Sequence, residues 1–217
     1  MNTKTQQLND LFARWEQAVT DYQGKFVKDG IVDERLYDNA PVKILFIAKE
    51  PNNPKQEAGD FREWWQKELA FSFSYRIAEW SFGLLNNFPQ YDDIWAQEGA
   101  AINALHHIAF MNIKKTGGSA NSDNNRMMEH LKMNIEFLHQ QIDIISPNVI
   151  ITGTSWDDLR NGLFPDVKWK SSGYRVFIGR HKMAKVISFY HPSSRNAPAA
   201  SYSLLQNIVN SDQFKQL

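Results

Sequence analysis

The chain has 217 residues, of which 42% are hydrophobic and 22% are charged. That length is enough for one large domain with its own core, and that composition is typical of a soluble globular protein. No run approaches the ~20 consecutive apolar residues of a membrane span, and the N-terminus lacks the basic start and apolar block of a secretory signal. We therefore expect a single domain over residues 1–217, cytoplasmic and monomeric, with no membrane partner.

The chain has no cysteine, which excludes disulfides, thiolate zinc sites and cysteine-ligated iron–sulfur clusters. Twenty-four Lys and Arg residues balance twenty-four Asp and Glu residues, giving a formal charge of zero. Proteins that coat long stretches of nucleic acid usually carry a basic excess, because phosphate neutralisation supplies much of their affinity. Any contact with DNA is therefore expected to be local. No cofactor and no metal are implied.

Helical patterns recur along the whole chain. Apolar residues follow the spacing of an amphipathic helix over residues 5–22, and similar patterns lie around 61–70 and 76–88. A long helix is predicted from Met128 to Ile142. A closing helix is predicted to begin near Pro198, because proline is favoured at the first helical position.

Four short runs rich in apolar and β-branched residues lie between these helices, at 42–48, 107–112, 149–153 and 185–190. Such runs, bounded by turn residues, are typical of buried strands. Residues 174–178 fit either an edge strand or part of a hairpin. Strands that alternate with helices predict an α/β protein, with a three-layer α/β/α architecture around a central, mostly parallel, four-stranded sheet.

Polar side chains follow three of the predicted strands. Glu50 comes after the first, Asn112 ends the second and His191 follows the last. In open α/β sheets, ligands bind beyond the carboxyl ends of the strands. We therefore expect these three side chains to converge on one cleft.

Four segments resemble motifs of the uracil-DNA glycosylase superfamily. Residues 44–52 are similar to its first motif, a strand followed by a small residue and then an acidic or amide residue beside proline, here Glu50 and Pro51. Residues 110–115 resemble the segment that supplies the base-reading asparagine, and 146–153 resemble a structural strand of that fold. Residues 188–193 resemble the last motif, a strand that leads into His-Pro-Ser. The resemblance covers roughly residues 40–195 in the expected order.

This resemblance implies a uracil-DNA glycosylase-like fold and an enzyme that hydrolyses the N-glycosidic bond of uracil, or another modified base, flipped out of DNA. Glu50 would position a water and stabilise an oxocarbenium-like sugar, as carboxylates do in glycoside hydrolysis. His191 would donate to a carbonyl oxygen of the leaving base. Asn112 would read the Watson–Crick edge of the base, because an amide both donates and accepts.

The resemblance also implies contacts around the base and along the DNA backbone. Phe61 and Pro51 are expected beside the base, with Phe71 and Phe73 as the alternative stacking rings. Phosphate contacts are expected from the ends of the 110–115 and 188–193 segments and from the residues just after the latter. Solvated surface side chains are the alternative interpretation of this set, which comprises Lys114, Lys115, Ser193 and Arg195.

The sequence departs from the family pattern at two places. Ala48-Lys49 stands where these enzymes usually carry a glycine and a polar or small residue, and the iron–sulfur branch is excluded by the lack of cysteine. After His-Pro-Ser, Arg195 lies where better-known members insert an apolar wedge. Two other functions therefore stay open: a catalytically weak nucleic-acid-binding module of the same fold, and a hydrolase of small nucleosides or nucleotides.

Overall fold

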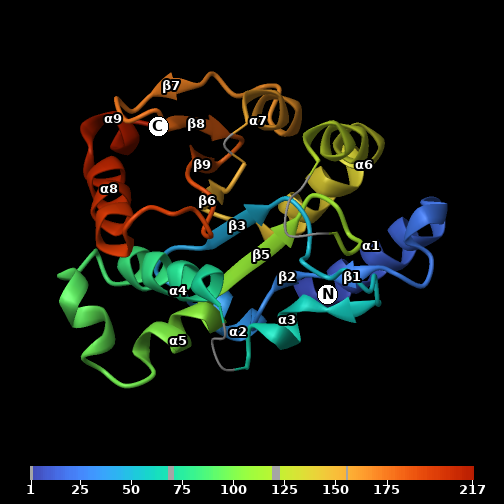
Figure 1. Cartoon of the computed structure of the whole chain (residues 1–217), viewed down its shortest axis with the longest axis horizontal. Helices are drawn as coiled ribbons and strands as arrows, with labels where there is room; N and C mark the ends of the chain where they lie inside the picture. Colours follow the sequence, from blue (N-terminus) through green and yellow to red (C-terminus); the bar gives the residue numbers. More distant parts are fainter. Residues whose placement is uncertain (1, 68–70, 119–122, 155) are drawn as a thin grey trace.

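The computed structural model describes residues 2–67, 71–118, 123–154 and 156–217, in which helices alternate with short strands (Figure 1). The four predicted runs form β3 (Ile44–Ala48), β5 (Ile108–Asn112), β6 (Val149–Thr152) and β9 (Ala184–Ser188). These strands pair in parallel in the order β5-β3-β6-β9. The prediction of an α/β protein is confirmed.

The prediction of a four-stranded sheet is wrong, because the described residues form a seven-stranded mixed sheet in the order β2-β5-β3-β6-β9-β8-β7. Strand β2 (Gly30–Ile31) pairs antiparallel with β5 at one edge. At the other edge, β8 (Phe177–His181) and β7 (Lys170–Ser171) continue the sheet antiparallel. Strands β2 and β7 are two residues long, which is too short to produce a periodic signal in the sequence.

Strands β8 and β9 form a hairpin, which resolves the two interpretations of residues 174–178 in favour of the hairpin. His181 pairs with Ala184 across a turn in which Lys182 has a φ of 52°. A separate two-stranded sheet joins β1 (Val27–Lys28) to β4 (Gly59–Asp60).

The described helices agree with the predicted ones in order but differ in length. The predicted 5–22 helix ends at residue 18, and Thr20–Tyr22 is a 3₁₀ turn. Within the pattern at 61–70, helix α3 covers 61–64 and residues 68–70 lie outside the described part of the chain, whereas the closing helix does begin at Pro198. The helices are α1 (Lys4–Ala18), α2 (Glu34–Asp38), α3 (Phe61–Trp64), α4 (Ser72–Leu85), α5 (Ala100–Ala104), α6 (Asn124–Ile145), α7 (Asp157–Leu163), α8 (Pro198–Asn210) and α9 (Asp212–Lys215).

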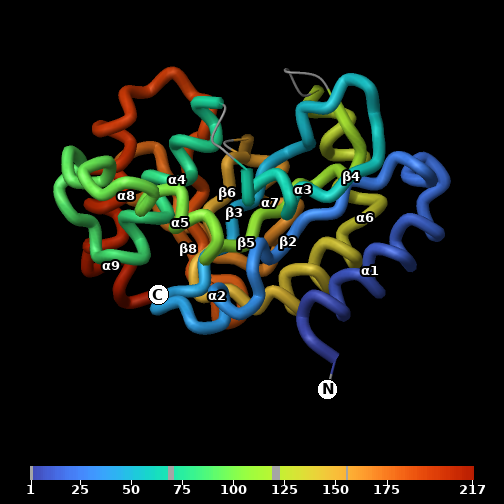
Figure 2. The backbone as a smooth tube through the Cα atoms, turned by 90° about the horizontal axis from the view of Figure 1, so that it is seen from below, coloured from blue at the N-terminus to red at the C-terminus, as the bar shows by residue number. Residues whose placement is uncertain are grey.

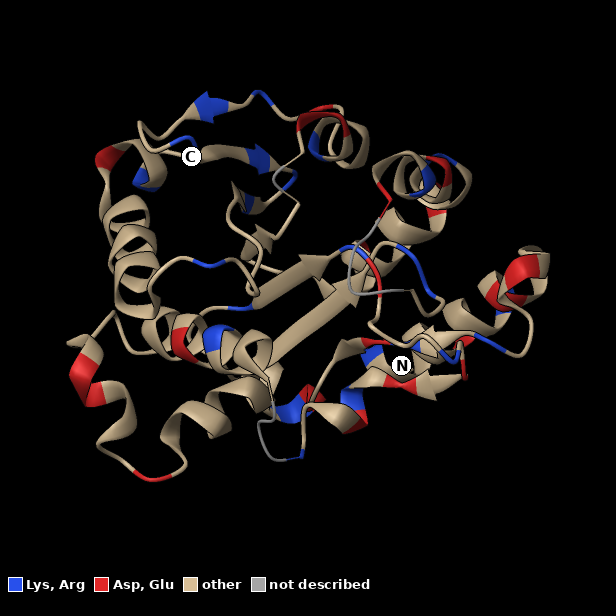
Figure 3. Cartoon of the chain, in the orientation of Figure 1, with Lys and Arg blue, Asp and Glu red and all other residues tan. Residues whose placement is uncertain are grey.

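Helices cover both faces of the sheet, with α1 and α6 on one side and α4, α5 and α8 on the other (Figure 2). Leu45 and Ile47 of β3 belong to the first core, and Ile44 and Phe46 belong to the second. Strands covered on both faces are apolar throughout. Accordingly, β3 and β5 carry no charged residue, and the charges lie on the surrounding elements (Figure 3). None of the described helices has both the length and the apolar character needed to cross a bilayer.

The strand register brings the polar strand ends to one edge of the sheet. Ala48 lies opposite Asn112, and Thr152 lies opposite both Ile47 and Ser188. Because these strands are parallel, the loops that follow them emerge together. The segments that contain Glu50, Asn112 and His191 therefore start from the same edge.

Candidate functional site

Asn112 ends β5 with its side chain on the face that α4 covers, since it lies two residues after Phe110 and strand side chains alternate. The residue is 1% exposed, and its backbone N–H donates to Oδ2 of Asp29 at 2.8 Å. Within the described residues, its side-chain Nδ2 is buried and has no hydrogen-bond partner. Leaving such a donor unpaired costs about 1–3 kcal/mol, so this atom marks a place that an acceptor on a ligand would fill.

Asp29 fixes the end of β5. Its carboxylate accepts from the backbone of Asn112, from Nζ of Lys115 at 2.7 and 2.8 Å, and from Nε2 of Gln141 at 2.7 Å. Asp29 is not among the site residues predicted from the sequence. Its signal is the turn-forming pair Asp29-Gly30 after Phe26-Val27-Lys28 and before Ile31-Val32, which does not reveal which strand the carboxylate reaches.

His191 is held as a neutral hydrogen-bond donor. Its Nδ1 accepts from the backbone N–H of Ser193 at 3.1 Å, so in the neutral ring the hydrogen is on Nε2. Burial lowers the pKa of His191 below its usual value, and the ammonium of Lys49 lowers it further. The ring packs against the chain after β6, where a Cβ on Gly153 would lie 3.4 Å from Cδ2 of His191.

A cluster of aromatic rings connects β5 to His191. The ring of Phe73 lies 5.7 Å from that of Phe110 and 5.8 Å from that of His191. The ring of Phe61 lies 5.3 Å from Phe110 and stacks on Trp64 at 4.9 Å. Of the three rings considered from the sequence, Phe73 is therefore the one that the structure brings beside His191.

The apolar space beside these residues is nearly filled. A cavity of about 10 Å³ is bordered by Ala48, Phe110, Gly153, Tyr190 and Pro192. A space of this size holds about one water molecule. Asn112 does not border this cavity and is 1% exposed, so a nucleobase reaches its amide only if the covering side chains move apart.

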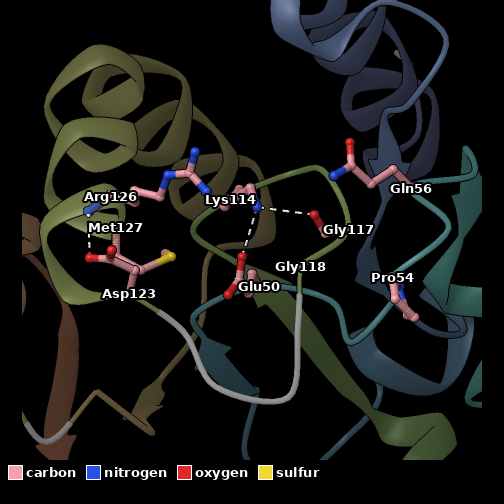
Figure 4. A pocket seen from close by; sticks show the side chains of 9 residues that line it. All are labelled: Glu50, Pro54, Gln56, Lys114, Gly117, Gly118, Asp123, Arg126 and Met127. Atoms are coloured by element: carbon pink, nitrogen blue, oxygen red, sulfur yellow. Dashed lines mark hydrogen bonds and ion pairs between the residues drawn. The ribbon is translucent and has the colours of Figure 1, made fainter.

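Glu50 lies in a different and more open pocket (Figure 4). Its Oε2 accepts from Nζ of Lys114 at 2.7 Å, and the same ammonium donates to the carbonyl of Gly117 at 3.0 Å. The carboxylate of Glu50 lies close to Gly118, because a Cβ added to Gly118 would be 2.0 Å from Oε2. The pocket has a volume of about 280 Å³ and is completed by α6, including Arg126.

The predicted residues thus share one edge of the sheet but form two groups. Asn112 and His191 belong with the aromatic cluster, whereas Glu50 is paired with Lys114 in the pocket beside α6. The charge that acts on His191 comes from Lys49. Pro51 is buried, and its carbonyl accepts from the backbone of Gly118 at 2.9 Å, so it joins the two loops.

The residues predicted to contact DNA differ in exposure and pairing. The expectation for Lys115 is wrong: its side chain is fully buried and its ammonium is bound to Asp29, out of reach of any phosphate. Lys114 is 17% exposed and already paired with Glu50. Ser193 and Arg195 are exposed on the loop that follows His191.

Arg76 of α4 holds the loop that follows His191 through hydrogen bonds. Its guanidinium donates to the carbonyl of Asn196 at 3.0 Å and to Oγ of Ser201 at 2.8 Å. The backbone of Ser194 donates to the carbonyl of His191 at 2.8 Å. Arg76 was missed in the sequence, because an arginine within an amphipathic helix is normally interpreted as a solvated residue.

Among the residues that the structure describes, no group of three His, Asp or Glu side chains is placed to hold a metal ion. The sequence matches no protein-family model and no curated protein.

Proposed function

We propose that this chain is a DNA glycosylase with a uracil-DNA glycosylase-like fold, which hydrolyses the N-glycosidic bond of uracil or another modified base flipped out of DNA. The observation that carries the proposal is the buried, unpaired amide of Asn112 on the sheet face where His191 packs on Phe73. A uracil edge presents a donor at N3 and an acceptor at O4. One amide satisfies both atoms.

The roles follow from the chemistry of bond cleavage. The C1′–N bond breaks with its electron pair moving to the base, and His191 donates from Nε2 to the carbonyl oxygen on which negative charge develops. Glu50 lies in the neighbouring pocket, so its role requires the sugar to lie between the two groups of residues once the base has entered; it then positions the water whose oxygen bonds to C1′, and its carboxylate accepts the released proton. Lys114 holds that carboxylate through the 2.7 Å contact.

Base entry requires a rearrangement of the aromatic cluster. Phe73 is half-buried between Phe110 and His191, and the present cavity beside them has a volume of only about 10 Å³. We propose that Phe73 swings aside and stacks on the base, as flipped bases are held between apolar or aromatic faces. Phe61 then supports this cluster from the far side of Phe110.

The DNA contact in this proposal is small, with Ser193 and Arg195 meeting phosphates beside the flipped base. Charge reversal at Arg195 should weaken DNA binding and reduce the slope of log affinity against log salt by about one. The matched control is charge reversal at Arg14, which is exposed on α1. Equal losses from both changes would assign the binding to overall charge.

The decisive experiment is a base-release assay on single- and double-stranded oligonucleotides that carry uracil or other modified bases. We expect Glu50→Gln and His191→Asn each to reduce release ~10²–10³-fold, the usual effect of losing one positioned electrostatic group. The matched controls are Glu57→Gln, on the same loop as Glu50, and His107→Asn, which precedes β5. Absence of release by the unmodified protein would contradict the proposal.

Asn112 is tested by base choice. Asn112→Asp replaces the amide donor with an acceptor, which should weaken uracil release and relax discrimination towards cytosine. Asn103→Asp, at an exposed position of α5, is its control. If the Asn112 variant handles both bases as the unmodified protein does, Asn112 does not read the base.

Hydrolysis of small nucleosides or nucleotides is the second candidate, and the state of the two neighbouring lysines favours it. Lys115 is buried and Lys114 is paired with Glu50, so neither offers a free charge to a DNA backbone. Release of base from free deoxyuridine at a rate equal to that from an oligonucleotide would select this candidate.

A further inference from the structure

A second cavity of about 450 Å³ lies where α7 meets the β8–β9 hairpin. It is bordered by two arginines, two serines and aromatic rings, with one carboxylate from Asp157. Its volume lies in the range of small-molecule sites. The polar lining residues used below are Arg160, Arg175, Ser171 and Ser188.

Arg160 is the central feature of this cavity. The residue is 6% exposed, and its guanidinium carbon lies 4.1 Å from the ring centre of Phe177 and 5.1 Å from that of Trp169. Its Nε is buried, with no hydrogen-bond partner in the described part of the chain. Its ion-pair partner, Asp157, lies 3.2 Å from NH1 and has a side chain that is 66% exposed.

A buried guanidinium in this state requires an acceptor. Unpaired buried N–H groups are costly, and an exposed carboxylate contributes little to an ion pair. The planar fork of arginine matches the oxygens of phosphate or carboxylate groups in a bidentate manner. The aromatic rings fix the plane of Arg160, so its donors are oriented before a ligand arrives.

The lining favours an anionic ligand. Arg175 contributes a second guanidinium at an exposed position, and the two arginines outnumber the single carboxylate of Asp157. Hydroxyl groups of Ser171 and Ser188 add neutral donors. A phosphate monoester carries close to two charges and three acceptor oxygens at neutral pH, whereas a carboxylate carries one charge and two oxygens.

We propose that this cavity binds a phosphate monoester carried on an organic group, such as the 5′-phosphate of a nucleotide or of a nucleic-acid end. Tyr190 borders both this cavity and the small space beside Phe110, so the phosphate site lies immediately next to the His191 loop. The proposal does not depend on base release, because it rests on Arg160, Arg175 and the shape of this cavity.

Calorimetric titration tests the site with three probes: inorganic phosphate, deoxyuridine 5′-monophosphate and deoxyuridine. We expect saturable binding of the monophosphate that is at least ~10-fold tighter than any binding of the unphosphorylated nucleoside. Arg175→Asn should weaken binding at least ~10-fold, the effect of losing one charge-assisted hydrogen bond. Asparagine is chosen because Arg175 has a φ of 56°, which asparagine tolerates.

Arg180→Gln is the matched control, because Arg180 is exposed on β8 and does not border the cavity. Arg160→Lys keeps the charge but removes the fork, and should also weaken binding while thermal unfolding shows a folded protein. Comparison of 5′-phosphorylated and unphosphorylated oligonucleotides distinguishes a nucleic-acid end from a free nucleotide as the source of the phosphate.

Three results would overturn the proposal: no binding of the monophosphate at millimolar concentration, equal binding of deoxyuridine, or equal losses in the Arg175 and Arg180 variants. A further titration uses benzoate as a carboxylate probe. Binding of benzoate as tight as that of the monophosphate would reject the preference for phosphate. These outcomes are independent of the base-release assay, which tests His191 and Asn112, so failure of one proposal leaves the other intact.

Discussion

Lys114 and Lys115 are neighbours in the sequence, yet they occupy opposite environments. Lys115 is fully buried, and its ammonium contacts both carboxylate oxygens of Asp29. Lys114 lies at the wall of an open pocket and contacts one oxygen of Glu50 and the carbonyl of Gly117. Both residues lie in the bent segment that follows β5, where a step of one residue separates the core from the pocket.

The two lysines show that the role of a charged residue depends on how deeply its ion pair is buried. The Lys115 ammonium also lies 5.2 Å from the ring centre of Trp15 and 6.0 Å from that of Phe12, and burial lowers the pKa of Lys115. That pair is therefore part of the structural core. The pair of Lys114 and Glu50 instead borders the open pocket beside α6.

The largest expected effect comes from breaking the inner pair. Lys115→Met leaves Asp29 as an uncompensated buried charge, and removing one partner of such a pair lowers the free energy of unfolding by about 3–5 kcal/mol. Urea denaturation measures this loss. Lys25→Met, at an exposed position, is the control. A loss below 1 kcal/mol for Lys115→Met would show that the two pairs do not differ as described.

Gly117 and Gly118, which follow the two lysines, also differ in their surroundings. A Cβ on Gly117 would lie 2.0 Å from the backbone carbonyl oxygen of Asn53, which has little freedom to move, so Gly117→Ala should cost about 1–3 kcal/mol. The three heavy atoms nearest to a Cβ on Gly118 all belong to the carboxylate of Glu50, a side-chain group that can rotate away. Gly118→Ala should therefore cost less but release Glu50 from Lys114. Equal stability of the two variants in urea denaturation would contradict this difference.

The outer pair should contribute less to stability than the inner pair. Lys114→Met is expected to lower the free energy of unfolding by less than Lys115→Met does, because the Lys114 side chain keeps 17% of its surface exposed beside an open pocket, whereas that of Lys115 is fully buried. Base release should fall nevertheless, since Glu50 loses the contact that holds it. The measurement combines urea denaturation with the oligonucleotide assay, and a stability loss as large as that of Lys115→Met would remove the distinction.

The smallest effect concerns Lys49, the third lysine at this edge of the sheet. Its ammonium contributes to the lowered pKa of His191, so Lys49→Met should raise that pKa towards 6.5, as followed by NMR titration of the ring. Because the folded pKa lies below the unfolded value of 6.5, the unfolded chain binds more protons as pH falls through this window. The His191 contribution to stability is therefore present above pH 6.5 and lost below it. Lys55→Met should leave the titration unchanged.

The sequence was informative where burial is continuous. Strands β3, β5, β6 and β9 are buried along nearly their whole length, and runs of apolar and β-branched residues reveal such strands directly. The edge strands β2 and β7 follow from pairing with distant segments, which local sequence does not encode. The prediction therefore found the parallel centre and missed both short antiparallel strands.

The candidate site was predictable in part for a related reason. Asn112 and His191 were identifiable because they follow strong strand signals. The burial of Lys115 depends on Asp29, which precedes it by 86 residues and contacts it only in the folded chain. The proximity of Phe73 to His191 likewise depends on how α4 packs on the sheet. Long-range pairing decides these features, and no local pattern records them.

The position of Asp29 has a consequence for the order of folding. Its contacts with Asn112, Lys115 and Gln141 span 83, 86 and 112 residues, so they close some of the longest loops in the chain. Long-range contacts incur the loop-closure entropy before they yield any stabilisation, and they form late. We expect the end of β5 to acquire its final geometry only when the N-terminal segment docks, because Asp29 supplies these contacts. The orientation of Asn112 would then be among the last features of the molecule to mature.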